Sequence, residues 1–278
     1  MNLPALTPKS AWLPVTPRGV AAFALAKNSR LLLVQFMVAI ITACCIGWFL
    51  HQAWAPAIRE AIAKIPDDAC IQSGALSWPT NSPVLLSEQH FLGITVDLDH
   101  TGQMTPTSHL QIELGKNGWQ VSSLLGVLDL PSWVSTKYPA DVRIALNRSE
   151  LEPWWAAREP FLILIAMAGV VVWLMMLWPV LGVIYSAPVW LVGFFSNRAL
   201  DWRASWRLGC AVLMPGALLM SASIVLYGLR AFDLMKLAVA FGLHLVVGWV
   251  YLIVSPLFLG RHPDTPAPAP NPFHTSEK

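Results

Sequence analysis

The stretch LLLVQFMVAIITACCIGWFL, residues 31–50, is apolar apart from Gln35 and Thr42. A helix needs about 20 consecutive apolar residues to cross the hydrocarbon core of a bilayer, so this stretch predicts a first transmembrane helix. A polar segment, residues 51–159, follows it and carries 12 of the chain's 16 carboxylates. Residues 161–259 are then almost continuously apolar. This order predicts a membrane protein with a folded polar domain inserted after its first helix.

The composition favours the same class. Charged residues make up 12% of the chain and hydrophobic residues 55%, and the mean hydropathy is +0.55. Soluble globular domains carry roughly 25% charged residues. We therefore expect the lipid bilayer to be the main surrounding of this chain, and we expect no nucleic-acid partner.

The second apolar block, residues 161–195, contains no charged residue. Pro179 and Pro188 would each remove a helical hydrogen bond and kink the chain. We therefore expect one span at 161–178, followed by a kinked or interfacial helix at 180–196. The alternative is that this block crosses the membrane twice.

Two more spans are predicted at 207–228 and 234–259, joined by a short turn at Leu229–Asp233. The predicted fold is thus an α-helical bundle of four transmembrane helices, or five in the alternative. Residues 160–260 form its membrane domain after the inserted polar segment.

The positions of Lys and Arg predict the orientation. Cytoplasmic loops retain these residues, whereas translocated segments need not. The segment before the first span and the loop between the second and third spans are basic, through Lys9, Arg18, Lys27, Arg30, Arg198, Arg203 and Arg207. We therefore expect the basic segment 1–30 and the tail 261–278 in the cytoplasm of a bacterium, with the spans in its inner membrane.

The same model places residues 51–159 outside the cytoplasm. This segment holds 12 acidic and 7 basic residues, a net charge of −5. At the other end of the chain, the alternating prolines of the tail 261–278 favour an extended, disordered conformation.

The extracytoplasmic segment reads as a small α+β domain. Apolar residues recur at helical spacing from Trp54 to Ile65, so the first helix should continue outward until Pro66 stops it. We interpret Val127–Tyr138 as a loop or short helix near the membrane. Strand patterns follow the helix, with a hairpin turn at Gly115–Gly118, and they lie at 75–78, 83–86, 91–98, 110–114, 119–123 and 142–146.

Several short motifs stand in a characteristic order. After the first span and its outward helix come IPDD at 65–68, IQSGAL at 71–76 and TVD at 95–97, and the membrane part contains RASWRL at 203–208 before Pro215. In this the chain resembles a bacterial family of inner-membrane proteins that is related to the Yip-type membrane proteins and has a member named for maltodextrin utilisation. The resemblance covers most of the chain and implies a fold and a location, with no catalytic residues to transfer. The 14 tryptophans and the Pro-rich tail depart from the family's usual pattern.

The best local candidate for chemistry is Asp97-Leu98-Asp99-His100. Alternation along a strand would put Asp97 and Asp99 on one face, where two carboxylates can hold a divalent cation. No Gly-rich loop or further acidic cluster completes such a site. We therefore expect a polar strand end that faces water, and we predict no metal site.

Within the membrane part, His244 is an ionisable residue in the middle of a predicted span. It can donate a hydrogen bond to a neighbouring helix or ligate a cofactor or pigment, and the sequence supplies no partner ligand, so we predict no cofactor. Ala238 and Gly242 are four residues apart and give a small-residue face suited to close helix packing.

These observations predict a non-enzymatic accessory or assembly protein of the membrane. Its extracytoplasmic domain would bind a partner protein or ligand, with Trp78, Trp119 and Trp133 as candidate contacts beside Asp97 and Asp99. No catalytic residue is predicted. The alternative, which rests on the resemblance, is a membrane component that assists uptake of maltodextrin-type sugars or other transport.

Overall fold

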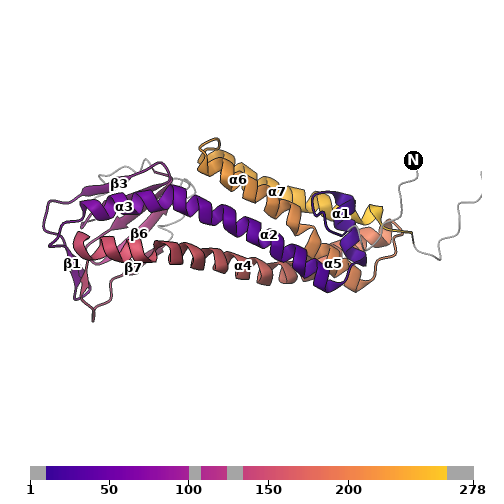
Figure 1. Ribbon diagram of the computed structural model, residues 1–278. Helices are drawn as coiled ribbons and strands as arrows, with labels where there is room; N and C mark the ends of the chain where they lie inside the picture. The colour runs from indigo at the N-terminus through magenta and orange to yellow at the C-terminus, as the bar shows by residue number, and fades with distance from the viewer. Residues whose placement is uncertain (1–10, 100–107, 124–133, 262–278) are drawn as a thin grey trace, which may run out of the picture. The chain divides into compact units, whose positions relative to one another are not determined.

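The structure is a computed structural model that describes residues 11–99, 108–123 and 134–261 (Figure 1). Its described part is mostly helical and contains a small sheet region. Four helices are long and apolar enough to span a membrane. Three earlier predictions fall outside the described residues, namely those for Trp133, for His100 and for the tail beyond Arg261.

The chain divides into two compact units, and each is described by itself. We call residues 1–42, 170–221 and 239–278 the helical unit. We call residues 43–169 and 222–238 the sheet unit. The helices have the following bounds: α1 Pro17–Ala21, the 3₁₀ helix η2 Ala22–Leu25, α2 Asn28–Phe49, the π-helical turn η3 Leu50–Trp54, α3 Ala55–Lys64, α4 Arg148–Phe195, α5 Trp202–Ala211, α6 Leu213–Gly228, α7 Leu234–Val254 and the 3₁₀ helix η5 Ser255–Phe258.

The first apolar helix continues past residue 50, as predicted. Helices α2, η3 and α3 follow one another without a break and end at Lys64. The next residue, Ile65, has extended backbone with φ −71° and ψ 129°, because a residue before proline is sterically driven away from the helical region. Pro66 therefore ends the helix at the position that the sequence predicts.

One helix covers the whole of the second apolar block. Helix α4 runs without interruption through residues 161–195 and is 48 residues long. A kinked continuation at 180–196 agrees with this helix, whereas a separate interfacial helix is absent. The alternative of two crossings is wrong because no turn divides the block.

Side chains donate hydrogen bonds to backbone carbonyls near Pro179 and Pro188 of α4. The Trp206 indole Nε1 donates a hydrogen bond of 3.3 Å to the Pro179 carbonyl, and the Ser186 hydroxyl donates one of 2.6 Å to the Val183 carbonyl. A proline removes one hydrogen bond of the helix, and neighbouring side chains can supply donors to carbonyls in the weakened region.

The core of the helical unit includes part of the N-terminal segment. Phe23 is fully buried in η2, which packs against α5. The Arg207 guanidinium on α5 donates two hydrogen bonds, of 3.1 and 2.6 Å, to the Ala24 carbonyl. The basic N-terminal segment is thus partly a core element, although its charges alone predicted only its orientation.

Neutral polar side chains are buried among the helices of this unit. Gln35 donates a hydrogen bond of 3.3 Å to the Cys210 carbonyl, next to the point where α5 gives way to α6. The Ser221 hydroxyl donates one of 2.9 Å to the Thr42 hydroxyl. Such groups are buried at low cost because each has a hydrogen-bond partner.

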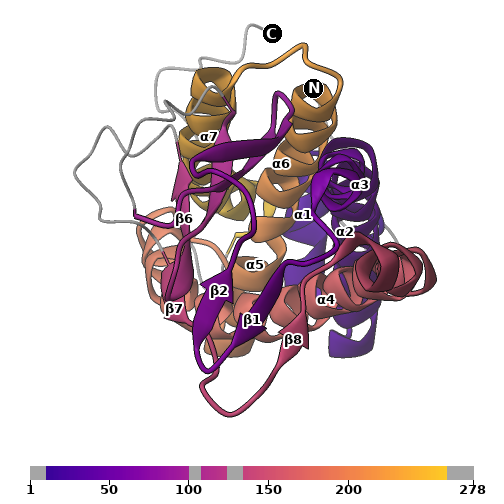
Figure 2. The same cartoon turned by 90° about the vertical axis from the view of Figure 1, so that its left-hand side faces the viewer.

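The sheet unit contains two sheets, with strand orders β3-β4-β5-β6-β7 and β2-β1-β8. Figure 2 shows β1 between β2 and β8. Neighbouring strands pair antiparallel, except β4 and β5, which are parallel. The strands are β1 Cys70–Gln72, β2 Ala75–Ser77, β3 Val84–Glu88, β4 Leu92–Val96, β5 Leu110–Leu114, β6 Gly118–Ser123, β7 Val134–Lys137 and β8 Ile144–Ala145.

The predicted hairpin is present, because β5 pairs with β6 across the turn that follows Leu114. Two strands were missed. Strand β7 contradicts the loop or short helix predicted at 127–138, in that part of this range that is described. Strand β1 pairs with β2 through Ser73 and Gly74, both at positive φ, the backbone that a two-residue hairpin turn requires.

Candidate functional site

A buried carboxylate on α4 binds two basic side chains of the preceding helix. Glu159 is 7% exposed, and the Arg59 guanidinium donates to both of its oxygens, at 2.9 Å through Nε and 2.6 Å through Nη2. His51 Nδ1 lies 3.2 Å from the Glu159 Oε1 atom. We call these three residues the ion triad. A two-pronged arginine–carboxylate contact fixes geometry as well as adding charge-assisted hydrogen bonds.

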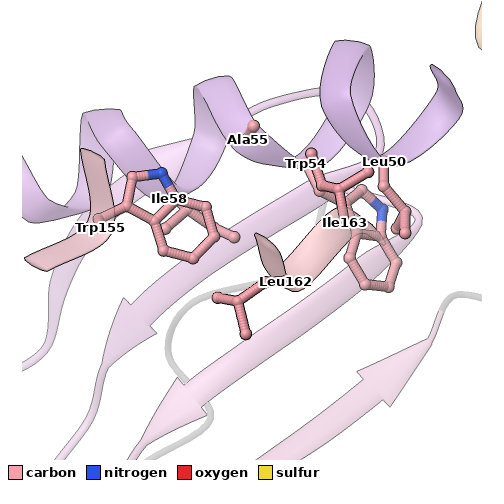
Figure 3. A pocket seen from close by; sticks show the side chains of 7 residues that line it. All are labelled: Leu50, Trp54, Ala55, Ile58, Trp155, Leu162 and Ile163. Carbon is pink, nitrogen blue, oxygen red and sulfur yellow. The ribbon is translucent and has the colours of Figure 1, made fainter. Parts of the chain in front are cut away.

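The triad lies on the helix faces that also enclose a pocket. Trp155, Glu159 and Leu162 are separated by four and three residues, so they share one face of α4. An apolar pocket of about 160 Å³ is formed between this face and the helix opposite it. Figure 3 shows the seven side chains that line the pocket, which are Leu50, Trp54, Ala55, Ile58, Trp155, Leu162 and Ile163.

The π-helical turn η3 lies at the pocket's edge and includes Leu50, His51 and Trp54. A π turn adds one residue to a helical turn and shifts the faces that follow it, and such turns are frequent at functional sites. Here Leu50 and Trp54 line the pocket while His51 reaches Glu159. The π-helical turn therefore places the apolar wall of the pocket and the ion triad at the same contact with α4.

The other side of α3 is held by the sheet. The Glu60 carboxylate accepts a hydrogen bond of 3.0 Å from the Ser87 hydroxyl of β3 and one of 2.8 Å from the Gln89 amide. Lys64 forms an ion pair with the same carboxylate at 2.8 Å. Adjacent residues of α3 thus face different neighbours, since Arg59 binds α4 and Glu60 binds β3. Helix α3, which forms one wall of the pocket, is thus held by hydrogen bonds to the sheet.

A second cluster of rings lies elsewhere in the sheet unit. His109 Nδ1 is 2.6 Å from the Tyr227 hydroxyl, and the two rings stack with centroids 5.5 Å apart. The His90 ring lies 4.3 Å from the His109 ring. Burial, and next the His90 ring, lower the pKa of His109 below its ordinary value, while Asp233 acts in the opposite direction. The cluster joins the start of β5 to the end of α6 through a neutral histidine.

The tryptophans predicted as contacts lie in different places. Trp78 packs against the core of the sheet unit, and its buried indole nitrogen has no hydrogen-bond partner among the described residues. Trp119 also packs against that core and lines a shallow groove along β6 and β7. Neither one lines the pocket between α3 and α4. Their role as contacts remains a prediction.

Asp97 and Asp99 are not arranged as expected. Strand β4 ends at Val96, so strand alternation does not extend to these two residues. Asp97 is 2% exposed, whereas Asp99 is exposed in a turn. The expectation of a polar strand end that faces water is therefore wrong for Asp97. Within the described ranges, no group of three or more His, Cys, Asp or Glu side chains could hold a metal ion.

The three residues predicted for helix packing in the last span have different surroundings. A Cβ atom added at Gly242 would have no neighbouring atom within 4 Å, and Ala238 is exposed. The close approach of α6 and α7 occurs instead at Gly216, where a Cβ atom would lie 2.9 Å from the His244 carbonyl. Packing through Ala238 and Gly242 remains a prediction. Nδ1 of His244 forms a hydrogen bond with the carbonyl of Phe241, in its own helix.

Sequence reasoning missed both the ion triad and its pocket. Arg59 and Glu159 are 100 positions apart in the chain, and no local pattern pairs residues at that separation. One sequence feature was informative in retrospect, because Glu159 is the last carboxylate before the uncharged block 161–195. A carboxylate at such a boundary requires a partner if it is buried.

With this geometry in hand, we compared the chain with known proteins. No protein-family model, curated protein or solved structure matches it.

Proposed function

We propose that this chain is a non-enzymatic accessory protein of the bacterial inner membrane that binds an amphiphile through the pocket between α3 and α4. The pocket receives a hydrocarbon segment of the ligand, such as part of an acyl chain. The observation that carries the proposal is an apolar pocket next to a buried ion triad, at the chain position where polar sequence becomes apolar.

The size and lining of the pocket support a hydrocarbon guest. Its volume of about 160 Å³ is close to that of an engineered apolar cavity of about 150 Å³ that binds benzene. The lining residues are aliphatic side chains and two tryptophan rings. A site of this kind offers contact area to hydrocarbon and few partners to water.

The ion triad supports a position near the membrane surface. The side chains of Arg59 and His51 are 53% and 56% exposed, whereas that of Glu159 is 9% exposed. Exposed basic groups beside an apolar pocket suit a ligand whose head stays in water while its chain is buried. In this proposal the triad also holds the two helices at the spacing that keeps the pocket open.

Photocrosslinking of the intact chain tests the proposal. We would use a C16 fatty acid with a diazirine near its methyl end, added to protein in lipid nanodiscs. Leu162 lines the pocket and is 40% exposed, so Leu162→Trp should fill the pocket with little strain elsewhere. Leu164→Trp is the matched control, because Leu164 lies two residues away, is 60% exposed and does not line the pocket.

The expected result is preferred labelling of the peptides that contain residues 50–58 and 155–163. Leu162→Trp should reduce that labelling several-fold, and Leu164→Trp should leave it unchanged. Labelling spread evenly over the apolar helices, or equal in the two variants, would refute the proposal.

The orientation is part of the same proposal, with both termini in the cytoplasm and residues 51–159 outside. Support comes from the basic segments and from four helices of spanning length. Single cysteines placed at the exposed positions Ser77 and Ser29, in a background without native cysteines, should react from opposite sides of spheroplasts with a membrane-impermeant maleimide. Reaction of both from the outside would reverse the model.

Assistance to sugar uptake remains the alternative proposal, and it is supported by the family resemblance alone. Unchanged maltodextrin uptake in a strain that lacks the protein would remove it. A complex with a partner protein, isolated in mild detergent, would instead move the proposal from an amphiphile to a protein ligand.

A further inference from the structure

A second cavity lies within the helical unit and is independent of the pocket described above. It has a volume of about 210 Å³ and is lined by residues of α2, α4, α6 and α7. Most of its lining is aliphatic, with Trp178 and Met220 among the larger side chains. Four lining residues, Thr42, Trp178, Tyr185 and His244, carry polar side-chain groups.

Glycines create part of this space. Gly216 and Gly248 both line the cavity. At Gly216 the backbone of α7 is so close that a Cβ atom would lie 2.9 Å from the His244 carbonyl. At Gly248 the nearest atom to such a Cβ is the Val212 carbonyl oxygen at 4.0 Å. A side chain at position 248 would therefore meet little resistance from the backbone and would occupy the cavity.

The hydrogen bonds of the polar lining groups decide which of them are available. Thr42 donates to the Val38 carbonyl at 3.0 Å and accepts from Ser221, so its hydroxyl is engaged. His244 Nδ1 faces the Phe241 carbonyl. Because a carbonyl only accepts, Nδ1 is the donor in this contact, and Nε2 is the ring nitrogen that can accept from a guest. The Tyr185 hydroxyl takes no hydrogen bond from the described residues and can donate or accept.

The His244 ring is half-buried on the largely apolar helix α7. Ionisable residues in the middle of spans usually have a partner or a function. A guest molecule that donates to Nε2 of His244 would supply such a partner. The surrounding cavity would at the same time accept the guest's apolar body.

We propose that the cavity of the helical unit binds a lipid-soluble molecule with a hydroxyl-bearing ring, whose O–H donates to Nε2 of His244 and whose ring and short chain fill the space beside Trp178 and Gly248. The volume suits one ring with a short alkyl chain, since benzene alone fills an engineered cavity of about 150 Å³. Tyr185 offers a second hydrogen bond to the same oxygen.

Binding of two matched probes to the full chain in lipid nanodiscs tests this inference. The probes are radiolabelled 4-hexylphenol and hexylbenzene, which differ only by the hydroxyl group. We expect saturable binding of 4-hexylphenol, tighter than that of hexylbenzene by roughly 3- to 10-fold, the value of one hydrogen bond.

Three variants assign the site. Gly248→Leu should abolish saturable binding by filling the cavity. Gly242→Leu is its matched control on the same helix and should bind like the wild type, because Gly242 has open space around it. His244→Phe keeps a ring of similar size and should equalise the two probes without abolishing binding.

Three results would overturn the inference: no saturable binding, binding unaffected by Gly248→Leu, or equal affinity of the wild type for both probes. Equal loss of binding in Gly248→Leu and Gly242→Leu would also overturn it, because the effect would then belong to the helix in general. None of these readouts depends on the pocket between α3 and α4.

Discussion

The two units of this chain bury polar groups by different means. In the sheet unit a carboxylate that is almost fully buried is balanced by a half-exposed guanidinium and a histidine at the junction of α3 and α4. In the helical unit several buried polar side chains are neutral groups that have one or two hydrogen-bond partners each. They include Gln35, Thr42 and Ser221.

The difference follows from the surroundings of each unit. Charges next to a polar segment can keep one side in water, so that their desolvation cost is limited. Polar groups surrounded by apolar helices cannot reach water. Uncharged side chains cost less free energy to bury there than charged ones. Close backbone approach at glycines then brings helices together in the helical unit, whereas paired charge and strand hydrogen bonds organise the sheet unit. The following predictions test this comparison.

The largest effect is expected at Gly182 of α4. A Cβ atom there would lie 2.2 Å from the Cys210 Sγ atom and 3.3 Å from the Cys210 nitrogen. Gly182→Ala should therefore destabilise the helical unit by about 3 kcal/mol, the upper part of the usual range for overpacking. Gly169→Ala is the control on the same helix, because no atom lies within 4 Å of its Cβ position. Thermal unfolding in detergent and hydrogen exchange should show the loss in the first variant only. Equal behaviour of the two would contradict the role of close approach.

Next comes the ion triad. Glu159→Gln removes the charge that both Arg59 and His51 contact and should cost about 2 kcal/mol, since hydrogen bonds to charged groups contribute roughly 1.5–3 kcal/mol and Arg59 is half exposed. Glu152→Gln is the control, because its pair with Arg148 is exposed at both ends and should contribute less than about 0.5 kcal/mol. Faster hydrogen exchange in α3, with unchanged exchange in α5, is the expected pattern. A loss as large in Glu152→Gln would show that burial of the pair is irrelevant.

A smaller effect should appear as pH dependence in the sheet unit. The folded chain lowers the pKa of His109 through burial and the nearby His90 ring, against the opposing influence of Asp233, which is paired with Lys236. The unfolded chain then binds a proton more readily than the folded one below the ordinary pKa of about 6.5. The stabilising contribution is complete above that value and is lost as the pH falls through the lowered folded pKa.

We therefore expect hydrogen exchange around β5 to be faster at pH 5 than at pH 7.5. His109→Gln should flatten this dependence, and His90→Gln should reduce it by removing the neighbouring ring. An unaltered pH dependence in His109→Gln would assign the effect to another group.

The smallest effect is expected at Thr42. Thr42→Val preserves shape and removes the hydroxyl that accepts from Ser221. The single proton of the Ser221 hydroxyl can then go to the Ala217 carbonyl, which is 2.8 Å away. The cost should be about 0.6 kcal/mol, the average for hydrogen bonds between membrane helices. A double-mutant cycle with Ser221→Ala measures it. A coupling above about 2 kcal/mol would mean that neutral groups bind these helices as strongly as the ion triad binds α3 to α4.

Much of the secondary structure was predictable because its causes are local. Hydropathy located four helices of spanning length, Pro66 ended the first of them, and the turn after Leu114 placed one hairpin. Other elements were not predictable in this way. Strand β7 forms because β6 offers an edge to pair with, and α4 continues past Pro179 although a proline locally favours a break.

The candidate sites show the same distinction between local causes and contacts of distant segments. His244 was identified from the sequence because an ionisable residue is conspicuous in an apolar span. Its cavity was not, because the cavity depends on glycines and side chains from four helices. Strand alternation predicted Asp97 and Asp99 on one face, but β4 ends at Val96, before either residue.

The sequence by itself determined the apolar and polar stretches and their order along the chain, because these depend on composition within short windows. Tertiary structure alone decided that Glu159 meets Arg59 across 100 residues and that His244 lines a cavity. Both arrangements are contacts between distant segments, and their free energy arises only when the helices have packed.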